Sequence, residues 1–347
     1  MSKTIVSILS DHLLPNFLFI KEMEGQYSDL LFVSTPQMEA QEKAMHLEVA
    51  LGRKEGSVRR IVVANDNYKE ILDTLRAEQL SDSVEYIVNI TGGTKTMSLA
   101  VHEYFCKFNA SFIYVPIGKN SYYDFSTDQT HSLDYRVSLN EYFTLYGLAY
   151  DYDNGLICGA QKPFKLFNEQ KMSNFYLTEE LRNAQKAPLP ELRRYLGGEW
   201  FEEYTYLRIK RDFELRDEDI AKSVKICRLS STSNDNELDV VFVKDNALYV
   251  IECKVSMIGY NKLFKTKNSK LSKTRNNKES KSVVDEYLYK LAAISKDFGL
   301  RVNSYIFTLH QMWHFSKATQ ENMSKRMRIL GIRDIIDGPK LTQPLKL

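Results

Sequence analysis

Hydrophobic and polar residues follow two alternating patterns in the first half of the chain. Short apolar runs rich in β-branched residues are separated by longer segments whose apolar residues recur at helical spacing. This alternation is typical of βαβ units around a parallel sheet. We expect strands at 4–9, 29–34, 59–64, 84–89 and 110–115, and helices at 36–51, 68–78 and 96–108, with another after Pro15. The pattern predicts a Rossmann-like α/β domain ending near Tyr150.

The pattern changes after Tyr150. Residues 151–187 have mixed polarity and little periodicity, which indicates a connector. The segment beyond it predicts an amphipathic helix at 190–207, strands at 223–230, 237–244 and 247–255, a helix at 283–298 and a strand at 301–309. Asp245 and Asn246 fit a hairpin turn between the second and third of these strands. We therefore predict two α/β domains, 1–150 and 188–347, joined by a connector at 151–187.

Composition narrows the class of protein. Hydrophobic residues make up 43% and charged residues 27% of 347, which excludes a disordered chain, and the net charge of +2 neither requires nor excludes a polyanionic partner. The four cysteines lack the spacing of zinc ligands. No apolar run approaches the roughly 18 residues that a membrane span needs, and the N-terminus has no signal-like segment. We expect a cytoplasmic protein without membrane contact.

Candidate chemistry concentrates on the expected hairpin. Asp239 lies on one strand, and Glu252 and Lys254 lie two residues apart on the next, so the last two share a face while Cys253 points the other way. Carboxylates are the ligands that Mg²⁺ or Mn²⁺ prefers, and a neighbouring lysine can orient water or balance charge on a phosphate. An ordinary cross-strand ion pair would also give this pattern. We interpret the set as a metal-dependent phosphodiesterase site.

The order of motifs resembles that of a known nuclease superfamily. A helix with Gly197-Gly198-Glu199-Trp200-Phe201-Glu202 precedes Asp239, and Glu252-Cys253-Lys254 follows on the next strand. This arrangement is similar to the PD-(D/E)XK nucleases, although Leu238 stands where the superfamily name has proline. The resemblance implies an α/β restriction-endonuclease-like fold. It gives catalytic roles to Glu202, or alternatively Glu203, and to Asp239, Glu252 and Lys254, with Asp239 and Glu252 as the metal ligands.

A basic segment follows this site. Eight cationic residues are crowded there: Lys262, Lys265, Lys267, Lys270, Lys273, Arg275, Lys278 and Lys281. Such a segment could be a solvated loop, but beside a nuclease site it favours contact with a nucleic-acid backbone without sequence preference. Tyr287, Lys290 and Lys296 on the next expected helix are candidates to face the site.

A glycine-rich loop follows the fourth expected strand of the first domain. Thr91-Gly92-Gly93-Thr94-Lys95 joins that strand to a helix, so backbone N–H groups and the helix N-terminus can approach an anion. The loop lacks the glycine that a Walker A motif requires before lysine, and it is not G-x-G-x-x-G, which disfavours an NTPase or a dehydrogenase.

This loop resembles the signature of CARF domains, which sense cyclic oligoadenylates in type III CRISPR immunity. Ser10-Asp11-His12 after the first strand is a second matching element. On that resemblance the ligand-contacting positions are Ser10, Asp11, Thr91, Gly92, Gly93, Thr94 and Lys95. The whole chain is similar to single-CARF PD-(D/E)XK effector nucleases, which implies a homodimer activated by cyclic tetra-adenylate and cutting DNA or RNA.

Several alternatives stay open. A ligand-responsive nucleic-acid-binding regulator with an inactive nuclease-like domain would share the same architecture, although the intact set of Asp239, Glu252 and Lys254 disfavours decay. The sensor domain could also hydrolyse its own ligand. Single-stranded DNA, nicked duplex and RNA all remain candidate substrates, because lysines on a backbone do not distinguish sugar or strandedness.

Overall fold

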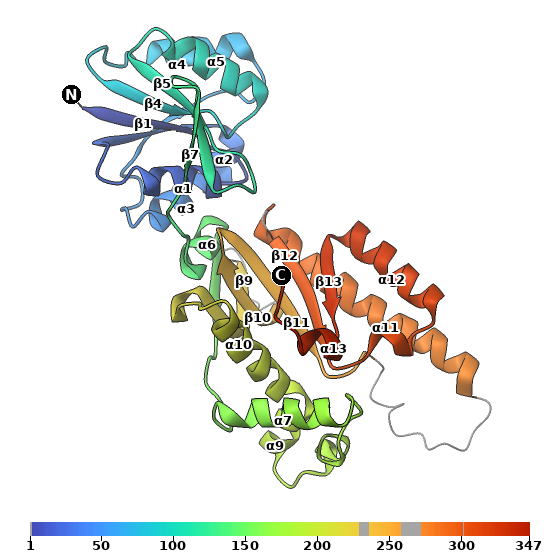
Figure 1. Ribbon diagram of the computed structural model, residues 1–347. Helices are drawn as coiled ribbons and strands as arrows, with labels where there is room; N and C mark the ends of the chain where they lie inside the picture. Colours follow the sequence, from blue (N-terminus) through green and yellow to red (C-terminus); the bar gives the residue numbers. More distant parts are fainter. Residues whose placement is uncertain (1, 229–235, 258–271, 301) are drawn as a thin grey trace.

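The chain forms two lobes, each built on its own β-sheet (Figure 1). The structure, a computed structural model, describes residues 2–228, 236–257, 272–300 and 302–347. The first lobe contains the N-terminus, and helix α6 (Leu139–Leu145) lies at the junction with the second. Among the described residues, no helix is long and apolar enough to cross a membrane.

The N-terminal sheet is mainly parallel, as predicted. Its seven strands lie in the order β3-β2-β1-β4-β5-β6-β7, and the first five of these are mutually parallel. They are β1 (Lys3–Ile8), β2 (Asp29–Ser34), β3 (Arg59–Val62), β4 (Glu85–Asn89) and β5 (Ala110–Tyr114). The antiparallel edge of β6 (Ser121–Asp124) and β7 (Gln129–Ser132) was not predicted, because these short strands are polar and lack buried residues.

Helices cover both faces of this sheet. Helices α1 (Leu14–Glu22), α2 (Pro36–Ala40) and α3 (Lys43–Ala50) follow the first two strands, and the apolar residues of α1 and α3 pack on one face. Helices α4 (Tyr68–Ala77) and α5 (Lys95–Phe105) pack on the other. The single helix expected over 36–51 is wrong: it breaks into α2 and α3 because Glu42 adopts a left-handed conformation (φ 56°).

The C-terminal sheet has six strands in the order β13-β12-β11-β10-β9-β8. Strands β8 (Leu148–Asp151), β9 (Ile220–Arg228), β10 (Asn236–Lys244) and β11 (Ala247–Lys254) are antiparallel, whereas β12 (Val302–Thr308) and β13 (Ile332–Ile336) run parallel to β11. The chain thus enters the second sheet at Leu148. The domain limits given above stay predictions.

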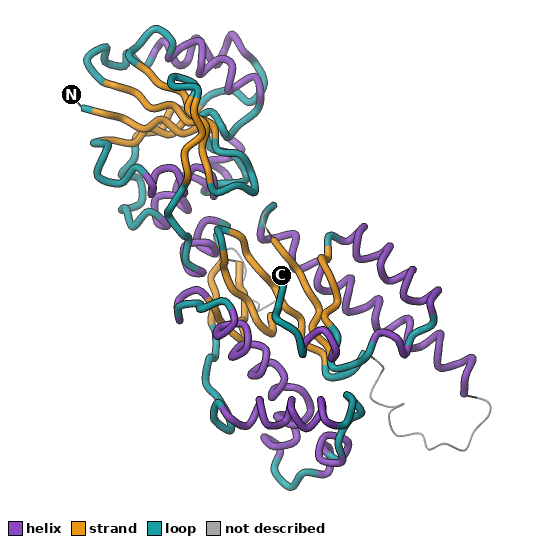
Figure 2. Tube along the Cα trace, viewed as in Figure 1, coloured by secondary structure: helices purple, strands orange, loops and turns teal. Residues whose placement is uncertain are grey.

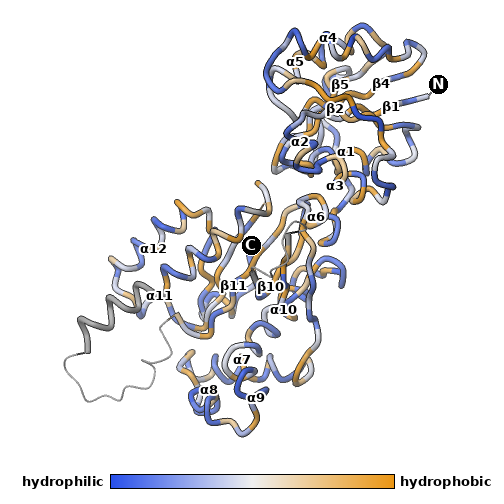
Figure 3. Tube along the Cα trace, turned by 180° about the vertical axis from the view of Figure 1, so that it is seen from behind, coloured by the Kyte–Doolittle hydropathy of each residue, from blue (hydrophilic) through white to orange (hydrophobic). Residues whose placement is uncertain are grey.

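Helices also cover both faces of the second sheet (Figures 2 and 3). One apolar cluster joins α7 (Gln161–Met172) and α10 (Trp200–Asp212) to the sheet, and another joins α6, α11 (Ser272–Ser295) and α12 (Lys317–Leu330) to its other face. The short helices α8 (Glu179–Arg182), α9 (Pro190–Arg194) and α13 (Gly338–Leu341) complete the lobe.

Two expectations for this lobe are wrong. The segment read as a connector contains α7, whose Leu166 and Phe167 are buried, so its weak periodicity hid a real helix. The helix expected over 190–207 is interrupted, because Gly198 takes an extended φ of 179° within a wide turn at Tyr195–Glu199. The continuous helix begins only at Trp200, and this break sets which side chains of α10 face the sheet.

Candidate active site and ligand loop

The β10–β11 hairpin brings Asp239 and Glu252 together at one end of the second sheet. The regular register begins at Val240, which pairs with Ile251. One residue before it, the Asp239 carboxylate Oδ2 accepts a hydrogen bond from the Cys253 backbone N–H at 2.6 Å. Both carboxylates are buried, with exposed fractions of 9% for Asp239 and 2% for Glu252. Two acidic groups are therefore held beside each other with little water.

Lys254 bridges these two carboxylates. Its Nζ lies 2.6 Å from Glu252 Oε1 and 3.3 Å from Asp239 Oδ2. Burial would lower the pKa of the Lys254 ammonium, but the charges of Asp239 and Glu252 raise it above its usual value. Burial, and then the charge of Glu252, raises the pKa of Asp239 to about 6. The structure thus brings together three residues that the sequence predicted as one site, with the ammonium between the acids.

Glu202, rather than Glu203, faces this site. Burial, and then the Asp239 charge, raises the pKa of Glu202 to about 8. Glu203 instead accepts a hydrogen bond from the Ile157 backbone N–H at 2.8 Å, and it is 1% exposed. Glu203 therefore has a structural role in fixing the segment before α7. Because the two residues are adjacent in sequence, only the phase of α10 distinguishes them.

Helix α11 adds two further groups, both among the sequence candidates. Lys290 Nζ lies 3.6 Å from Glu252 Oε1, and the Tyr287 ring centroid lies 5.5 Å from Lys254 Nζ. No contact of Lys296 with the site was found among the described residues. On the opposite face of the sheet, Cys253 packs with the apolar residues of α10, as predicted.

The donor set fits a hard divalent cation. Carboxylate oxygens are the preferred ligands of Mg²⁺ and Mn²⁺. Glu252 Oε1 is buried and has no well-oriented hydrogen bond, although the Lys254 ammonium is close. Within the described ranges, no three acidic, histidine or cysteine side chains are close enough to form a ready-made cluster. Asp239 and Glu252 could therefore hold a cation only if the Lys254 ammonium moves partly out of the space between the two carboxylates.

The predicted basic segment is described only in part. Residues 258–271, with Lys262, Lys265, Lys267 and Lys270, lie outside the described residues. Residues 272–283 form the first part of α11. The prediction of a basic loop therefore stays untested over its first half, and its second half is helical rather than a loop.

The glycine-rich loop lies against the end of β1. A Cβ atom on Gly92 would stand 2.0 Å from the Ile8 carbonyl oxygen and 3.3 Å from Ser10 Oγ. Gly93 adopts a positive φ of 76°, and a Cβ there would lie 2.5 Å from Ile8 Cγ2. Both glycines are thus required by close packing, and Ser10 lies next to the loop.

The threonines of the loop are engaged within the protein. Thr91 Oγ1 donates to Asn89 Oδ1 at 2.5 Å and accepts from the Val115 backbone N–H at 2.8 Å. Thr94 Oγ1 caps α5 by accepting from the Met97 N–H at 3.2 Å and donates to the Asn65 carbonyl at 3.0 Å. Their hydroxyls therefore shape the loop. Asp11, on the loop after β1, and Lys95, the first residue of α5, are exposed.

A buried pair of asparagines supports the loop and was not predicted as part of the site. Asn89 Nδ2 donates to Asn16 Oδ1 at 3.0 Å, and Asn16 Nδ2 donates to the Ile8 carbonyl at 2.9 Å. Their exposed fractions are 0% and 1%. This network ties the first residues of α1 to the glycine-rich loop. The available signal was Asn16 among the apolar residues at 14–20, the buried part of α1.

Comparisons with known proteins match two parts of the chain to two families. Residues 4–142 match the Card1 CARF domain family, and residues 190–339 match the Card1-like endonuclease domain family. No curated protein matches the sequence. The fold is similar to that of Can2 from Sulfobacillus thermosulfidooxidans, solved with cyclic tetra-adenylate, with 22% identity and a TM-score of 0.69 over 98% of this chain and 97% of that one.

Two other solved structures share the fold. Protein VC1899 from Vibrio cholerae has 16% identity and a TM-score of 0.69, over 98% of this chain and 95% of that one. A type III CRISPR defence DNA nuclease activated by cyclic oligoadenylate has 17% identity and a TM-score of 0.55, over 89% of this chain but 45% of that one. The chain thus combines a domain that matches the Card1 CARF family with a second domain that matches the Card1-like endonuclease family.

Proposed function

We propose that this chain is a divalent-metal-dependent endonuclease of the PD-(D/E)XK type that a cyclic oligoadenylate activates in type III CRISPR antiviral defence. The observation that carries the proposal is the pair of buried carboxylates, Asp239 and Glu252, bridged by the partly exposed Lys254 on adjacent strands, in one chain with a CARF domain. The cytoplasm is the location that we propose for this protein.

In the proposed site, Asp239 and Glu252 hold Mg²⁺ or Mn²⁺, and Glu202 approaches from α10. A bound divalent ion would polarise the phosphate and lower the pKa of a water molecule. Lys254 would then move from the two carboxylates toward the phosphate, where its positive charge stabilises the negative charge of the transition state. Lys290 is placed to neutralise Glu252 when Lys254 moves.

The activator we propose is cyclic tetra-adenylate, bound by Ser10, Asp11, Lys95 and the backbone of Gly92 and Gly93. The solved complex of Can2 with this ring supports the choice. Thr91 and Thr94 contribute through the shape of the loop, because their hydroxyls already have partners. We also propose a homodimer, since a two-fold interface matches a symmetric ring with two equal sets of loops.

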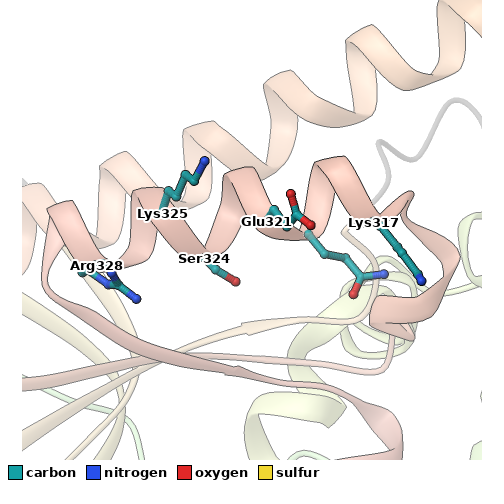
Figure 4. Close-up of a pocket in the computed structure, with 6 residues that line it drawn as sticks. Lys317, Glu321, Ser324, Lys325 and Arg328 are labelled. Atoms are coloured by element: carbon teal, nitrogen blue, oxygen red, sulfur yellow. The ribbon is translucent and has the colours of Figure 1, made fainter.

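Helix α12 offers one surface for the substrate backbone. Figure 4 shows an open pocket along this helix, lined by Lys317, Glu321, Ser324, Lys325 and Arg328. Three of these five side chains are cationic, and α12 packs against α11, the helix that carries Lys290. Contacts of this kind would give salt-dependent binding without sequence preference. DNA and RNA therefore both remain substrates of the proposal.

The test is a cleavage assay with the full-length chain. Plasmid, single-stranded DNA and RNA are incubated with Mn²⁺, with and without cyclic tetra-adenylate. We expect ring-dependent cutting that Glu252→Gln lowers by at least a hundredfold, whereas Glu286→Gln, an exposed carboxylate on α11, keeps wild-type cutting. Binding of nucleic acid without shortening under all these conditions would contradict the proposal and favour the alternative, a ligand-responsive regulator.

A further inference from the structure

The turn of the catalytic hairpin is fixed to the sensor domain by a buried asparagine. Asn246 and Asp245 form the β10–β11 turn with positive φ values of 59° and 52°. Asn246 is 1% exposed. A turn of this type usually carries glycine at its second position, because two consecutive left-handed residues are strained in most side chains. An asparagine that is buried there therefore needs a reason beyond the turn itself.

That reason is a complete set of hydrogen bonds across the domain junction. Asn246 Oδ1 accepts from the Val137 backbone N–H at 2.8 Å. Its Nδ2 donates to Asn120 Oδ1 at 3.1 Å and to the Tyr135 carbonyl at 3.0 Å. Asn120 Nδ2 returns a bond of 3.1 Å to the Asp245 carbonyl. A flipped amide would face donor with donor and acceptor with acceptor, so the network defines its orientation.

The partners of Asn246 are connected to the ligand loop through α1. At the end of α1, Glu22 Oε2 accepts from the backbone N–H groups of Asp134 and Tyr135, at 2.8 and 2.9 Å. At its beginning, Asn16 bonds to Asn89, which holds the glycine-rich loop. One short helix thus joins the ligand loop to the segment that grips the hairpin turn.

The junction also has room for movement. A cleft beside the turn is lined by the sensor segment 134–137 and by residues 213–216, which follow α10. The Asn246 hydrogen bonds lie beside this cleft, and Val137, one of their partners, belongs to an apolar cluster that continues to Val243 and Leu248 of the hairpin. A shift of the sensor segment would therefore pull on the turn directly.

We propose that Asn246 is a positioning residue that transmits the state of the ligand loop to the hairpin carrying Asp239 and Glu252. This inference rests on the proposed function, because it concerns how the ring controls the nuclease site. Coupling of this kind requires that the ring bind the two arrangements of the junction with different affinities. Asn246 would not touch ring, metal or substrate.

The test compares two glycine variants of the same turn. Asn246→Gly keeps the left-handed backbone and removes all three side-chain bonds, whereas Asp245→Gly keeps the Asn246 side chain and the bond to the Asp245 carbonyl. Three quantities are measured on the full-length protein: Mn²⁺-dependent cutting without ring, the Kd for cyclic tetra-adenylate, and the ratio of cutting rates with and without ring.

For Asn246→Gly we expect ring-free cutting and the Kd to stay within about threefold of wild type, and the activation ratio to fall at least tenfold, a coupling loss of about 1.4 kcal/mol. Asp245→Gly should keep the wild-type ratio. Glu22→Ala should lower the ratio, and adding Asn246→Gly to it should lower it little further. Because Trp200 and Trp313 both lie in the second lobe, their fluorescence checks that this lobe stays folded.

The possible failures are distinct. A wild-type protein that cuts nucleic acid without responding to the ring would contradict the proposed function. A wild-type protein that responds to the ring, beside an Asn246→Gly variant that responds equally, would overturn the role of Asn246 alone. Loss of ring-free cutting in Asn246→Gly would also overturn it, because the residue would then support the nuclease fold itself.

Discussion

Replacing Lys254 by methionine should destabilise the second lobe unless a divalent cation is present. Lys254 is the cation between two buried carboxylates, at 2.6 Å from Glu252 Oε1 and 3.3 Å from Asp239 Oδ2. With an effective dielectric constant of about 20, these separations correspond to attractions of about 6 and about 5 kcal/mol. The cost of removing the ammonium from water offsets much of this gain.

The net loss of unfolding free energy depends on which charges stay buried after Lys254 is replaced. Breaking a buried ion pair from one side costs about 3–5 kcal/mol, because the other charge stays buried without a partner. We expect the lower end, about 3 kcal/mol, for two reasons. Lys290 remains 3.6 Å from Glu252 Oε1, and Asp239, whose pKa is already raised to about 6, can take up a proton. Mn²⁺ at a hundred times its Kd would return about 2.7 kcal/mol.

The assay is urea unfolding followed by tryptophan fluorescence, which reports the second lobe because both tryptophans lie there. Lys254→Met should gain more stability from Mn²⁺ than wild type, in which the ammonium competes for the same oxygens. Lys290→Met is the matched control, and this half-exposed residue should change the free energy of unfolding by less than about 1 kcal/mol. A Lys254→Met variant as stable as wild type without metal, or an equal gain from Mn²⁺ in both, would refute this reasoning.

Two further predictions concern the ligand loop and pH. Gly92→Ala should weaken binding of cyclic tetra-adenylate at least tenfold while tryptophan-detected unfolding stays unchanged, because its Cβ would lie 2.0 Å from the Ile8 carbonyl oxygen; calorimetric titration with an unchanged Kd would count against it. Burial, and then the charge of His314, lowers the pKa of His310 to about 4, so the unfolded chain binds a proton that the folded lobe does not. The contribution of His310 to stability should therefore fall as pH decreases from about 6.5 to about 4, by at most about 3 kcal/mol, whereas the raised pKa values of Asp239 and Glu202 act in the opposite direction. His310→Asn should flatten this profile and His102→Asn, at an exposed histidine, should not; equal profiles in pH-dependent urea unfolding would exclude the assignment.

The elements that the sequence predicted well are those with strong apolar patterns. Strands β1, β2 and β4 of the first sheet are almost entirely buried, so their apolar runs were visible without any tertiary information. Strands β6 and β7 owe their existence to pairing at a sheet edge, and their own residues are polar and partly exposed. Helix α7 was missed for a related reason, because only a few of its residues are buried, and Leu166 and Phe167 among them belong to the apolar cluster that includes α10. Local patterns could not reveal contacts that depend on a distant partner.

The candidate site, like the fold, could be predicted only in part from local sequence patterns. Strand parity alone placed Glu252 and Lys254 on one face and Cys253 on the other. It could not decide between Glu202 and Glu203, because that choice depends on the break at Gly198 and on the resulting phase of α10. The hydrogen-bonding roles of Asn89 and Asn246 could not be predicted for another reason. Asn89 bonds to a residue 73 positions away, and Asn246 bonds to one more than 100 positions away. The local spacing of residues carries no information on such contacts.

The position of Asp239 explains how a small movement at the hairpin turn could matter to chemistry. Seven residues separate it from Asn246, a span of about 23 Å along an extended strand. The hairpin is paired on both sides, with β9 and β12, and a one-residue slip would turn every side chain to the wrong face, so large sliding is excluded. Only a twist of the hairpin, or a displacement of its strands by less than one residue, can be transmitted from the turn to the active site. At Asp239 the regular β10–β11 pairing ends, and the Asp239 carboxylate accepts a hydrogen bond from the Cys253 backbone N–H. Such a shift therefore acts directly on a candidate metal ligand.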